Sequence, residues 1–211
     1  MHGSIDAVPY IFPCVFRRTR CDGRRAVFCN RDGQFLFFFP SFVTKKDQAM
    51  DRDAALRTHV LNLLTARQAH CTFEEAVADM PLDRIGERPD GLPYSVWELV
   101  DHIRRAQYDI LAYCEDPDYQ AQEWPDAYWP TDPAPPSADV WTQTCAQVVA
   151  DRDALCEYLE DDAQDLYEAV PSSDDHTILR ELLLVADHNA YHIGQIVTAR
   201  RLLGCWTDSG T

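Results

Sequence analysis

The segment DHNAYHIGQ, residues 187–195, places His188 and His192 four residues apart in a leucine-rich stretch with helical periodicity. Residues four apart lie on one face of an α-helix, one turn above the other, so the two imidazoles reach a common neighbour. Such a pair holds the metal ion in helical metal sites. It is also consistent with a polar pair hydrogen-bonded to Tyr or Asp in a core. The spacing alone leaves both interpretations open.

A third histidine favours the metal site over the polar pair. His102 lies in VWELVDHIRRAQYDIL, among core-type positions of another predicted helix. In four-helix bundles, metal sites are built from inward side chains of facing helices. Two ligands from one helix and one from another leave a coordination position open, which suits catalysis better than a structural zinc site with four protein ligands. We therefore predict a divalent-metal site formed by His102, His188 and His192.

Two neighbours of the histidine pair are candidates for the same site. Gln195 lies one turn beyond His192, where its amide could hydrogen-bond a group at the metal or form an interhelical hydrogen bond. Tyr191 could line the site or pack as ordinary core. We expect surface or structural roles for the other histidines of the helical region, which are His59, His70 and His176.

These side chains must be positioned by helices, because the sequence from Met50 onwards has helical periodicity. The first stripe comprises Leu56, Val60, Leu63 and Leu64 and predicts a helix over residues 52–69. Capping residues mark the starts of the later helices, and a glycine marks the end of the last: Thr72, Ser95, Ser137, Thr177 and Gly204.

A long connection separates the helix of His102 from the next one. Residues 115–137 are rich in proline, which excludes a regular helix. The aromatic residues Trp124, Tyr128 and Trp129 predict that this connection packs on the body of the protein. Four long helices with one long crossover predict an all-α protein, a four-helix bundle.

The charge of the chain is strongly acidic, with a formal net charge of −16. No basic stripe runs along a predicted helix, so nucleic acid and anionic membrane surfaces are disfavoured as partners. No apolar run approaches the length of a membrane span. Eight cysteines without a C-x-x-C pair, and no secretory signal, favour reduced thiols in a cytoplasmic protein.

Residues 1–49 differ in composition from the remainder. Eight Lys and Arg against four Asp give them a balance of +4, which leaves −20 for residues 50–211. AVFCN-RDG-QFLFFF could pair as a hairpin around Arg31–Gly33, but no helical period organises the segment. One interpretation is a basic, aromatic arm that binds a partner. We favour the other, a disordered extension or a mis-assigned start, followed by a domain over residues 50–206 and a tail over residues 207–211.

Two segments of the chain resemble the DinB/YfiT-like metal-binding superfamily. They are LPYSVWELVDHIRRAQYDIL, with His102, and TILRELLLVADHNAYHIGQIVTARRLLGCW, with His188 and His192. The resemblance covers roughly Met50 to Trp206, including HCTFEEAVADMP and the YQAQEWPDAYWP crossover. It implies a four-helix bundle with up-down-down-up connectivity, a divalent metal such as zinc or nickel on the three histidines, and a homodimer in many members.

The resemblance also implies a choice of activities. Some members are thiol-dependent transferases or isomerases that use a low-molecular-weight thiol. We therefore expect a metal-dependent, S-transferase-like enzyme that acts on small-molecule electrophiles as substrates. One alternative is a metal-dependent hydrolase, which the lack of a general base among the stripe residues disfavours. The other is a non-catalytic metal- or ligand-binding protein of a stress response.

Overall fold

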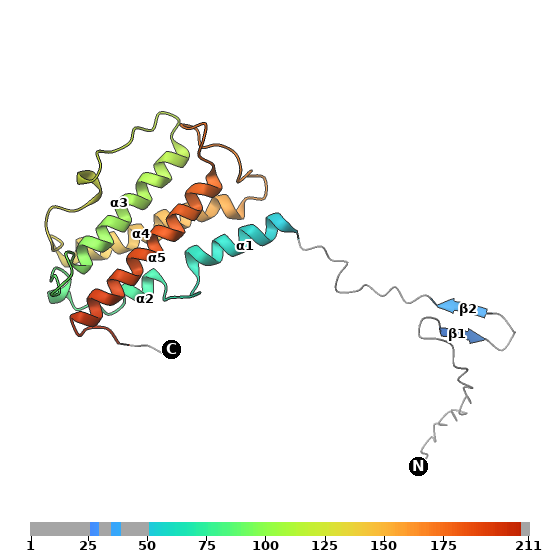
Figure 1. Cartoon of the computed structure of the whole chain (residues 1–211), viewed down its shortest axis with the longest axis horizontal. Coiled ribbons are helices and arrows are strands. Elements are labelled where there is room, and N and C mark those ends of the chain that lie inside the picture. The colour runs from blue at the N-terminus through green and yellow to red at the C-terminus, as the bar shows by residue number, and fades with distance from the viewer. Residues whose placement is uncertain (1–25, 30–34, 39–50, 208–211) are drawn as a thin grey trace, which may run out of the picture. The chain divides into compact units, whose positions relative to one another are not determined.

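The structure, a computed structural model, describes residues 26–29, 35–38 and 51–207 (Figure 1). The chain divides into two units, residues 1–49 and 50–211. In the first unit, strands β1 (Ala26–Cys29) and β2 (Phe35–Phe38) pair antiparallel, with Cys29 opposite Phe35. The hairpin that the sequence allowed is present in its strands, whereas its turn at Arg31–Gly33 lies outside the described residues.

The second unit contains four long helices and one short one: α1 (Arg52–Thr65), α2 (Phe73–Val77), α3 (Val96–Glu115), α4 (Ala138–Glu160) and α5 (Ile178–Leu202). Both α1 and α3 pack against α4 and α5, and α2 lies on α5. Figure 1 shows α3 and α4 running in one direction and α1 and α5 in the other. The predicted four-helix bundle with up-down-down-up connectivity is confirmed.

The helices begin where the sequence places capping side chains. Ser95 and Thr72 each form a complete capping box with the glutamate three residues later, Glu98 and Glu75. The side chains of Asp51, Ser137 and Thr177 cap the starts of α1, α4 and α5. Each cap satisfies a backbone N–H that has no partner within its helix.

The end of α5 is fixed by a glycine, as predicted. Gly204 has a φ of 69°, a left-handed conformation that residues with a side chain rarely adopt. Its N–H donates to the carbonyl of Arg201, and the N–H of Cys205 donates to the carbonyl of Arg200. These bonds satisfy two of the last carbonyls of the helix.

The core consists of two apolar clusters with a polar layer between them. One cluster, around Val100, joins α2 and the start of α3 to the end of α5. The other, around Leu155, joins α1 and the ends of α3 and α4 to the start of α5. On α5 the clusters are separated by the turns between Val185 and Ile193, which carry His188 and His192. The histidines therefore lie at mid-height in the bundle.

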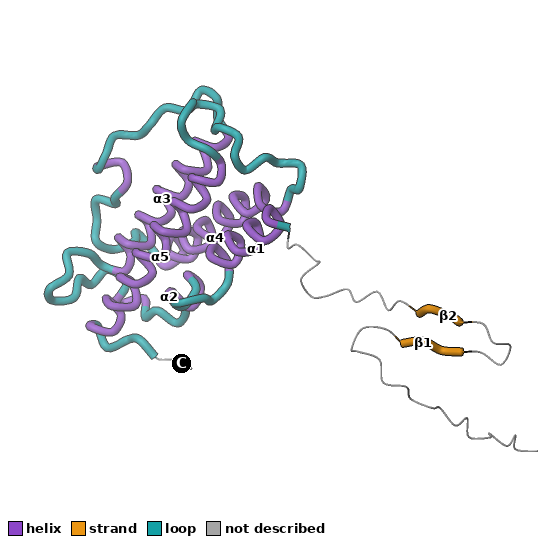
Figure 2. The backbone as a smooth tube through the Cα atoms, turned by 45° about the vertical axis from the view of Figure 1, so that its right-hand side comes forward, coloured by secondary structure: helices purple, strands orange, loops and turns teal. Residues whose placement is uncertain are grey.

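The crossover between α3 and α4 is bound to α3 along its length. Figure 2 shows this loop running back beside α3. The hydroxyls of Tyr119 and Tyr128 both donate to Asp109, at 2.9 and 2.6 Å, and Arg105 donates to the carbonyl of Ala127 at 3.0 Å. Tyr128 and Trp129 are half-buried, as predicted, but the prediction was wrong for Trp124, which is 70% exposed.

Two predictions for the first helix were wrong. α1 ends at Thr65 instead of continuing to residue 69, because Ala66 turns to an extended conformation and starts the loop to α2. Leu63 is 52% exposed, whereas Arg57 is buried and donates to the carbonyls of Tyr158 and Asp161 at the end of α4. A buried arginine of this kind breaks the apolar stripe on which the prediction relied.

Two predictions from composition concern cysteines and membranes. The five cysteines between residues 51 and 207 are free thiols. Burial raises the pKa of Cys114 and Cys145 to about 12, and that of Cys156 to about 11, so these thiols stay protonated and pack as small hydrophobes at neutral pH. Within the residues that the structure describes, no helix combines the length and the hydropathy needed to cross a membrane.

We predict that a chain starting at Met50 folds with an unchanged melting temperature. Both apolar clusters and all five helices are built from residues beyond that point. Circular dichroism melts of the full and shortened chains provide the measurement. A large fall in melting temperature on shortening would show that residues 1–49 stabilise the bundle.

Candidate metal centre

Three histidines from two helices converge in the polar layer of the bundle. His102 comes from the first half of α3, and His188 and His192 come from successive turns of α5. One nitrogen from each ring can be chosen so that all three lie within 4.8 Å of one another. His102 and His192 are buried and His188 is half-buried. Among the described residues, this is the single group of His, Cys, Asp or Glu side chains close enough to share a metal ion.

Hydrogen bonds at Nδ1 orient two of the rings. His102 Nδ1 donates to the carbonyl of Tyr128 at 2.8 Å, and His192 Nδ1 donates to Gln195 Oε1 at 2.7 Å. A proton fixed on Nδ1 leaves the lone pair on Nε2, which is the usual arrangement when histidine binds a metal. Both Nε2 atoms are therefore available as ligands.

The position of His188 provides a direct test of whether a cation fits. Its Nε2 lies 3.0 Å from the Nε2 of His102. Two lone pairs at this distance repel each other unless a proton or a cation lies between them. Zinc bound tetrahedrally at about 2.0–2.1 Å separates its nitrogen ligands by about 3.4 Å. The His102–His188 pair is within about half an ångström of that spacing, and the chosen nitrogens of all three rings lie within 4.8 Å of one another, so the residues fit a divalent ion.

A chain of side-chain amides, from the half-buried Asn189 to the buried Gln107, supports His188. Its Nδ1 lies 3.4 Å from the Asn189 side-chain oxygen. Asn189 Nδ2 donates to Gln107 Oε1 at 2.8 Å, and Gln107 Nε2 donates to the carbonyl of Val148 at 2.6 Å. This chain joins α5 to α3 and α3 to α4 in the polar layer, so the helices that carry the histidines are held in register.

An aromatic stack covers the other side of the cluster. The Trp129 ring lies parallel to His102, with centroids 3.9 Å apart and an angle of 4°, and Tyr94 stacks on Trp129 at 4.4 Å. The crossover loop therefore contacts His102 through both a carbonyl and an indole. The aromatic content of this loop indicated packing on the body, but no signal in the sequence identified His102 as the contact.

The environment keeps the imidazoles uncharged. Burial lowers the pKa of His102 and His192 from the ordinary 6.5 to about 4, and it lowers the pKa of His188 as well. Desolvation is the largest cause, because a buried imidazolium loses its hydration. At His192 the two neighbouring histidines lower the pKa further. Neutral rings retain the lone pairs that a metal ion requires.

The other residues that the sequence singled out lie beside the three-histidine cluster or away from it. Gln195 contacts the cluster through His192, and its Nε2 donates to the Tyr191 hydroxyl at 3.2 Å. Tyr191 is 65% exposed, so it is not core, and its ring lies next to that of His192, with centroids 5.0 Å apart. The three histidines expected to be surface or structural lie outside the cluster. His59 is exposed on α1, His70 is exposed in the loop after α1 instead of ending that helix, and His176 accepts or donates a hydrogen bond with the Tyr113 hydroxyl.

Comparison with known proteins identifies the family of this fold and site. The family model of the DinB superfamily matches residues 65–196, more than half of the chain and a range that includes all three histidines. The chain belongs to the DinB superfamily. No curated protein and no solved structure matches it. For this DinB domain, the candidate site is therefore defined by the geometry of its own residues.

We predict that His102→Ala and His192→Ala each remove most of the metal bound by the DinB domain. Two remaining imidazoles hold a divalent ion poorly, and the loss in affinity should exceed the roughly 10- to 100-fold cost of removing a ligand's hydrogen-bond partner. Elemental analysis after loading with zinc or nickel provides the measurement, with His59→Ala as the matched control. Full metal content in His102→Ala would show that the third ligand lies elsewhere.

The buried imidazoles also predict a pH dependence. In chelator-treated DinB domain, the free energy of unfolding should fall as the pH drops from about 6.5 towards 4. Unfolded histidines take up protons in this window, whereas His102 and His192 stay neutral in the folded state. Urea unfolding at several pH values measures the slope.

The control isolates the histidines from other titrating groups. His192→Leu should show a smaller slope than the wild type between these pH values. Equal slopes in the two proteins would contradict the assignment.

Proposed function

We propose that this DinB protein is a divalent-metal-dependent S-transferase that joins a low-molecular-weight thiol to a small electrophile. The observation that carries the proposal is the convergence of three neutral imidazoles, two buried and one half-buried, next to the exposed Tyr191. Nitrogen ligands of this kind suit zinc and nickel. His102, His188 and His192 would hold the ion, and its open coordination position would lower the pKa of a thiol or a water.

The charge of the ligand set favours this chemistry. Three neutral imidazoles cancel none of the ion's positive charge, and no carboxylate of the described residues joins the cluster. Asp101, the acidic neighbour of His102, is paired with Arg104 and Arg105 at 2.8 and 2.7 Å. The site therefore keeps a net positive charge, which stabilises an anionic nucleophile.

The polar side chains next to His192 favour a thiol over water as the nucleophile. Tyr191 and Gln195 are the polar side chains beside His192 on the exposed side of α5, and neither is a strong base at neutral pH. A free thiol ionises near pH 8.5, whereas free water has a pKa of about 15.7, so the thiol needs much the smaller lowering of its pKa by the ion. S-transfer therefore asks less of these residues than hydrolysis does.

The transfer step assigns a role to each side chain. The thiol gives its proton to solvent, its sulfur forms a bond to an electrophilic carbon, and a carbon–oxygen bond such as that of an epoxide breaks. The released oxygen then takes up a proton. Tyr191 accepts a hydrogen bond from Gln195, so its own hydroxyl proton is available to that oxygen. Gln195 and the Tyr128 carbonyl hold His192 and His102 in orientation.

We predict metal-dependent formation of thioether when the zinc- or nickel-loaded protein is mixed with a panel of thiols and epoxides. Mass spectrometry of the adducts provides the measurement. His192→Ala should reduce the rate to that of the uncatalysed reaction. Tyr191→Phe should keep its metal and lose about tenfold in rate, the cost of one hydrogen bond to a developing charge.

Tyr167→Phe is the matched control, because Tyr167 is equally exposed and lies outside the site. Its rate should equal that of the wild type. A loaded protein that accelerates no thiol addition but cleaves esters or amides would overturn the proposal in favour of a hydrolase. A loaded protein with no turnover in either assay would overturn it in favour of a metal-binding module.

A further inference from the structure

Residues 127–129 of the crossover are bound by three side chains on one face of α3. His102, Arg105 and Asp109 are three and four residues apart, a spacing that aligns them along the helix. His102 donates to a carbonyl of this segment at 2.8 Å, Arg105 donates to another at 3.0 Å, and Asp109 accepts from a tyrosine hydroxyl at 2.6 Å. The first of these contacts belongs to the metal centre, and the other two lie further along α3.

Tyr128 is held at both of its ends. Its carbonyl accepts from His102 Nδ1, and its hydroxyl donates to Asp109. The two residues on α3 are seven apart, which is about 10.5 Å along a helix axis, so Tyr128 extends along the helix between them. A tyrosine side chain rotates about two χ bonds, so a fixed hydroxyl confines the carbonyl to few positions. The position of the hydroxyl therefore controls the bond to His102.

Every hydrogen bond to the Asp109 carboxylate, within the described part of the chain, comes from the crossover. Besides Tyr128, the donors are the Tyr119 hydroxyl at 2.9 Å and Gln122 Nε2 at 3.4 Å. Asp109 is half-buried and forms no ion pair among the described residues, because Arg105, one turn earlier, pairs with a different carboxylate. The hydrogen-bonding capacity of this charged group is thus used to hold the loop.

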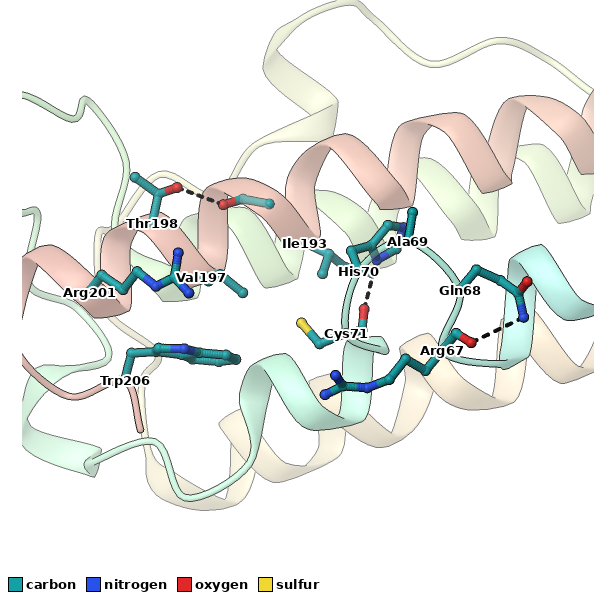
Figure 3. Close-up of a pocket in the computed structure, with 11 residues that line it drawn as sticks. Arg67, Gln68, Ala69, His70, Cys71, Ile193, Val197, Thr198, Arg201 and Trp206 are labelled. Atoms are coloured by element: carbon teal, nitrogen blue, oxygen red, sulfur yellow. Dashed lines mark hydrogen bonds between the residues drawn. The ribbon is translucent and has the colours of Figure 1, made fainter. Parts of the chain in front are cut away.

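A comparison with His70 shows why His102 needs such an anchor. Figure 3 shows His70 in the loop between α1 and α2, where its Nδ1 donates to the carbonyl of Cys71 at 2.7 Å. These two residues are neighbours in the chain, so their bond closes no loop. The carbonyl bound to His102 lies 26 residues further along the chain. Bringing it to the ring costs the entropy of ordering the intervening residues, unless other contacts already hold it.

We propose that Asp109 is a positioning residue of the metal centre, which acts through Tyr128 to fix the His102 ring with its Nε2 towards His188 and His192. Because the carboxylate holds the hydroxyl, the carbonyl is in place before the ring bonds to it. Loss of a partner that orients a ligand commonly weakens metal binding about 10- to 100-fold. This role affects the ion through the metal binding proposed above, on which it rests, and is independent of the thiol reaction.

The first measurement follows ring N–H protons by NMR in the full chain without metal. The Nδ1 proton of His102 should exchange slowly with water in the wild type, because it is buried and hydrogen-bonded. Asp109→Ala and Tyr128→Phe should each speed this exchange at least about tenfold, since each removes a hydrogen bond to a charged group. The Nδ1 proton of His192 is the internal reference, because it donates to Gln195 and has no bond to the crossover.

The second measurement is the rate at which the zinc-loaded chain releases zinc to an excess of chelator. Asp109→Ala and Tyr128→Phe should each release zinc about tenfold faster than the wild type. The double variant should be no faster than either single variant, because both changes break the same bond. Tyr119→Phe is the matched control: it removes the other hydroxyl bound to the same carboxylate, away from the segment that contacts His102, and should keep the wild-type rate.

Two outcomes would overturn the role of Asp109. One is a wild-type rate of ring exchange and of zinc release in both Asp109→Ala and Tyr128→Phe. The other is an equal increase in Tyr119→Phe and Tyr128→Phe, which would show a general loosening of the loop. Tyr128→Phe keeps the ring and the backbone of this residue, so it decides the question if Asp109→Ala fails to fold.

The thioether assay separates this role from the proposed activity. A wild type that forms no thioether, with faster zinc release in Asp109→Ala, would overturn the transferase and leave the positioning role in place. An active wild type, with unchanged ring exchange and zinc release in Asp109→Ala and Tyr128→Phe, would do the reverse. A wild type that holds no zinc would overturn the metal-dependent function, and the exchange of the His102 proton would then decide the positioning role.

Discussion

The packing of three imidazoles between α3 and α5, two of them buried and one half-buried, is the constraint on which the arrangement of this DinB domain depends. A ring nitrogen removed from water needs a partner, or its desolvation counts against the folded state. The domain supplies those partners from three places: the Tyr128 carbonyl in the crossover, the Gln195 amide one turn further along α5, and Asn189 beside His188. The second nitrogens are left close to one another, where one cation could satisfy all three together.

The same constraint accounts for the division of the core. Apolar clusters at the two ends of the bundle supply the stabilisation that hydrophobic burial provides, and the polar layer between them supplies little. The polar layer instead fixes the axial offset between the helices. The hydrogen bonds from Asn189 to Gln107, and from Gln107 to the carbonyl of Val148, can form at only one axial offset of α5, α3 and α4. Sliding a helix by one turn would leave these amides unsatisfied in the core.

The histidines and the helix starts could be predicted from the sequence because both have short, local signatures. A spacing of four residues and a Ser-x-x-Glu box are set by helix geometry alone, and the structure bears out the bundle, the caps and the meeting of His102 with His188 and His192. Contacts made by backbone carbonyls have no such signature, so the anchoring of His102 by Tyr128 could not be foreseen. Leu63 was misplaced because periodicity does not reveal that a buried arginine, Arg57, can take the inward position. The contacts of Asp109 with the crossover join segments that no helical period connects.

The hydrogen bond between His102 and the Tyr128 carbonyl links the site to the longest connection in the bundle. By pinning the crossover near its middle, it replaces one long loop closure with two shorter ones, and each segment samples fewer conformations. Linkage is reciprocal: whatever restrains the His102 ring restrains the crossover, and whatever loosens the crossover loosens the ring. The centre and the loop are thus expected to open together.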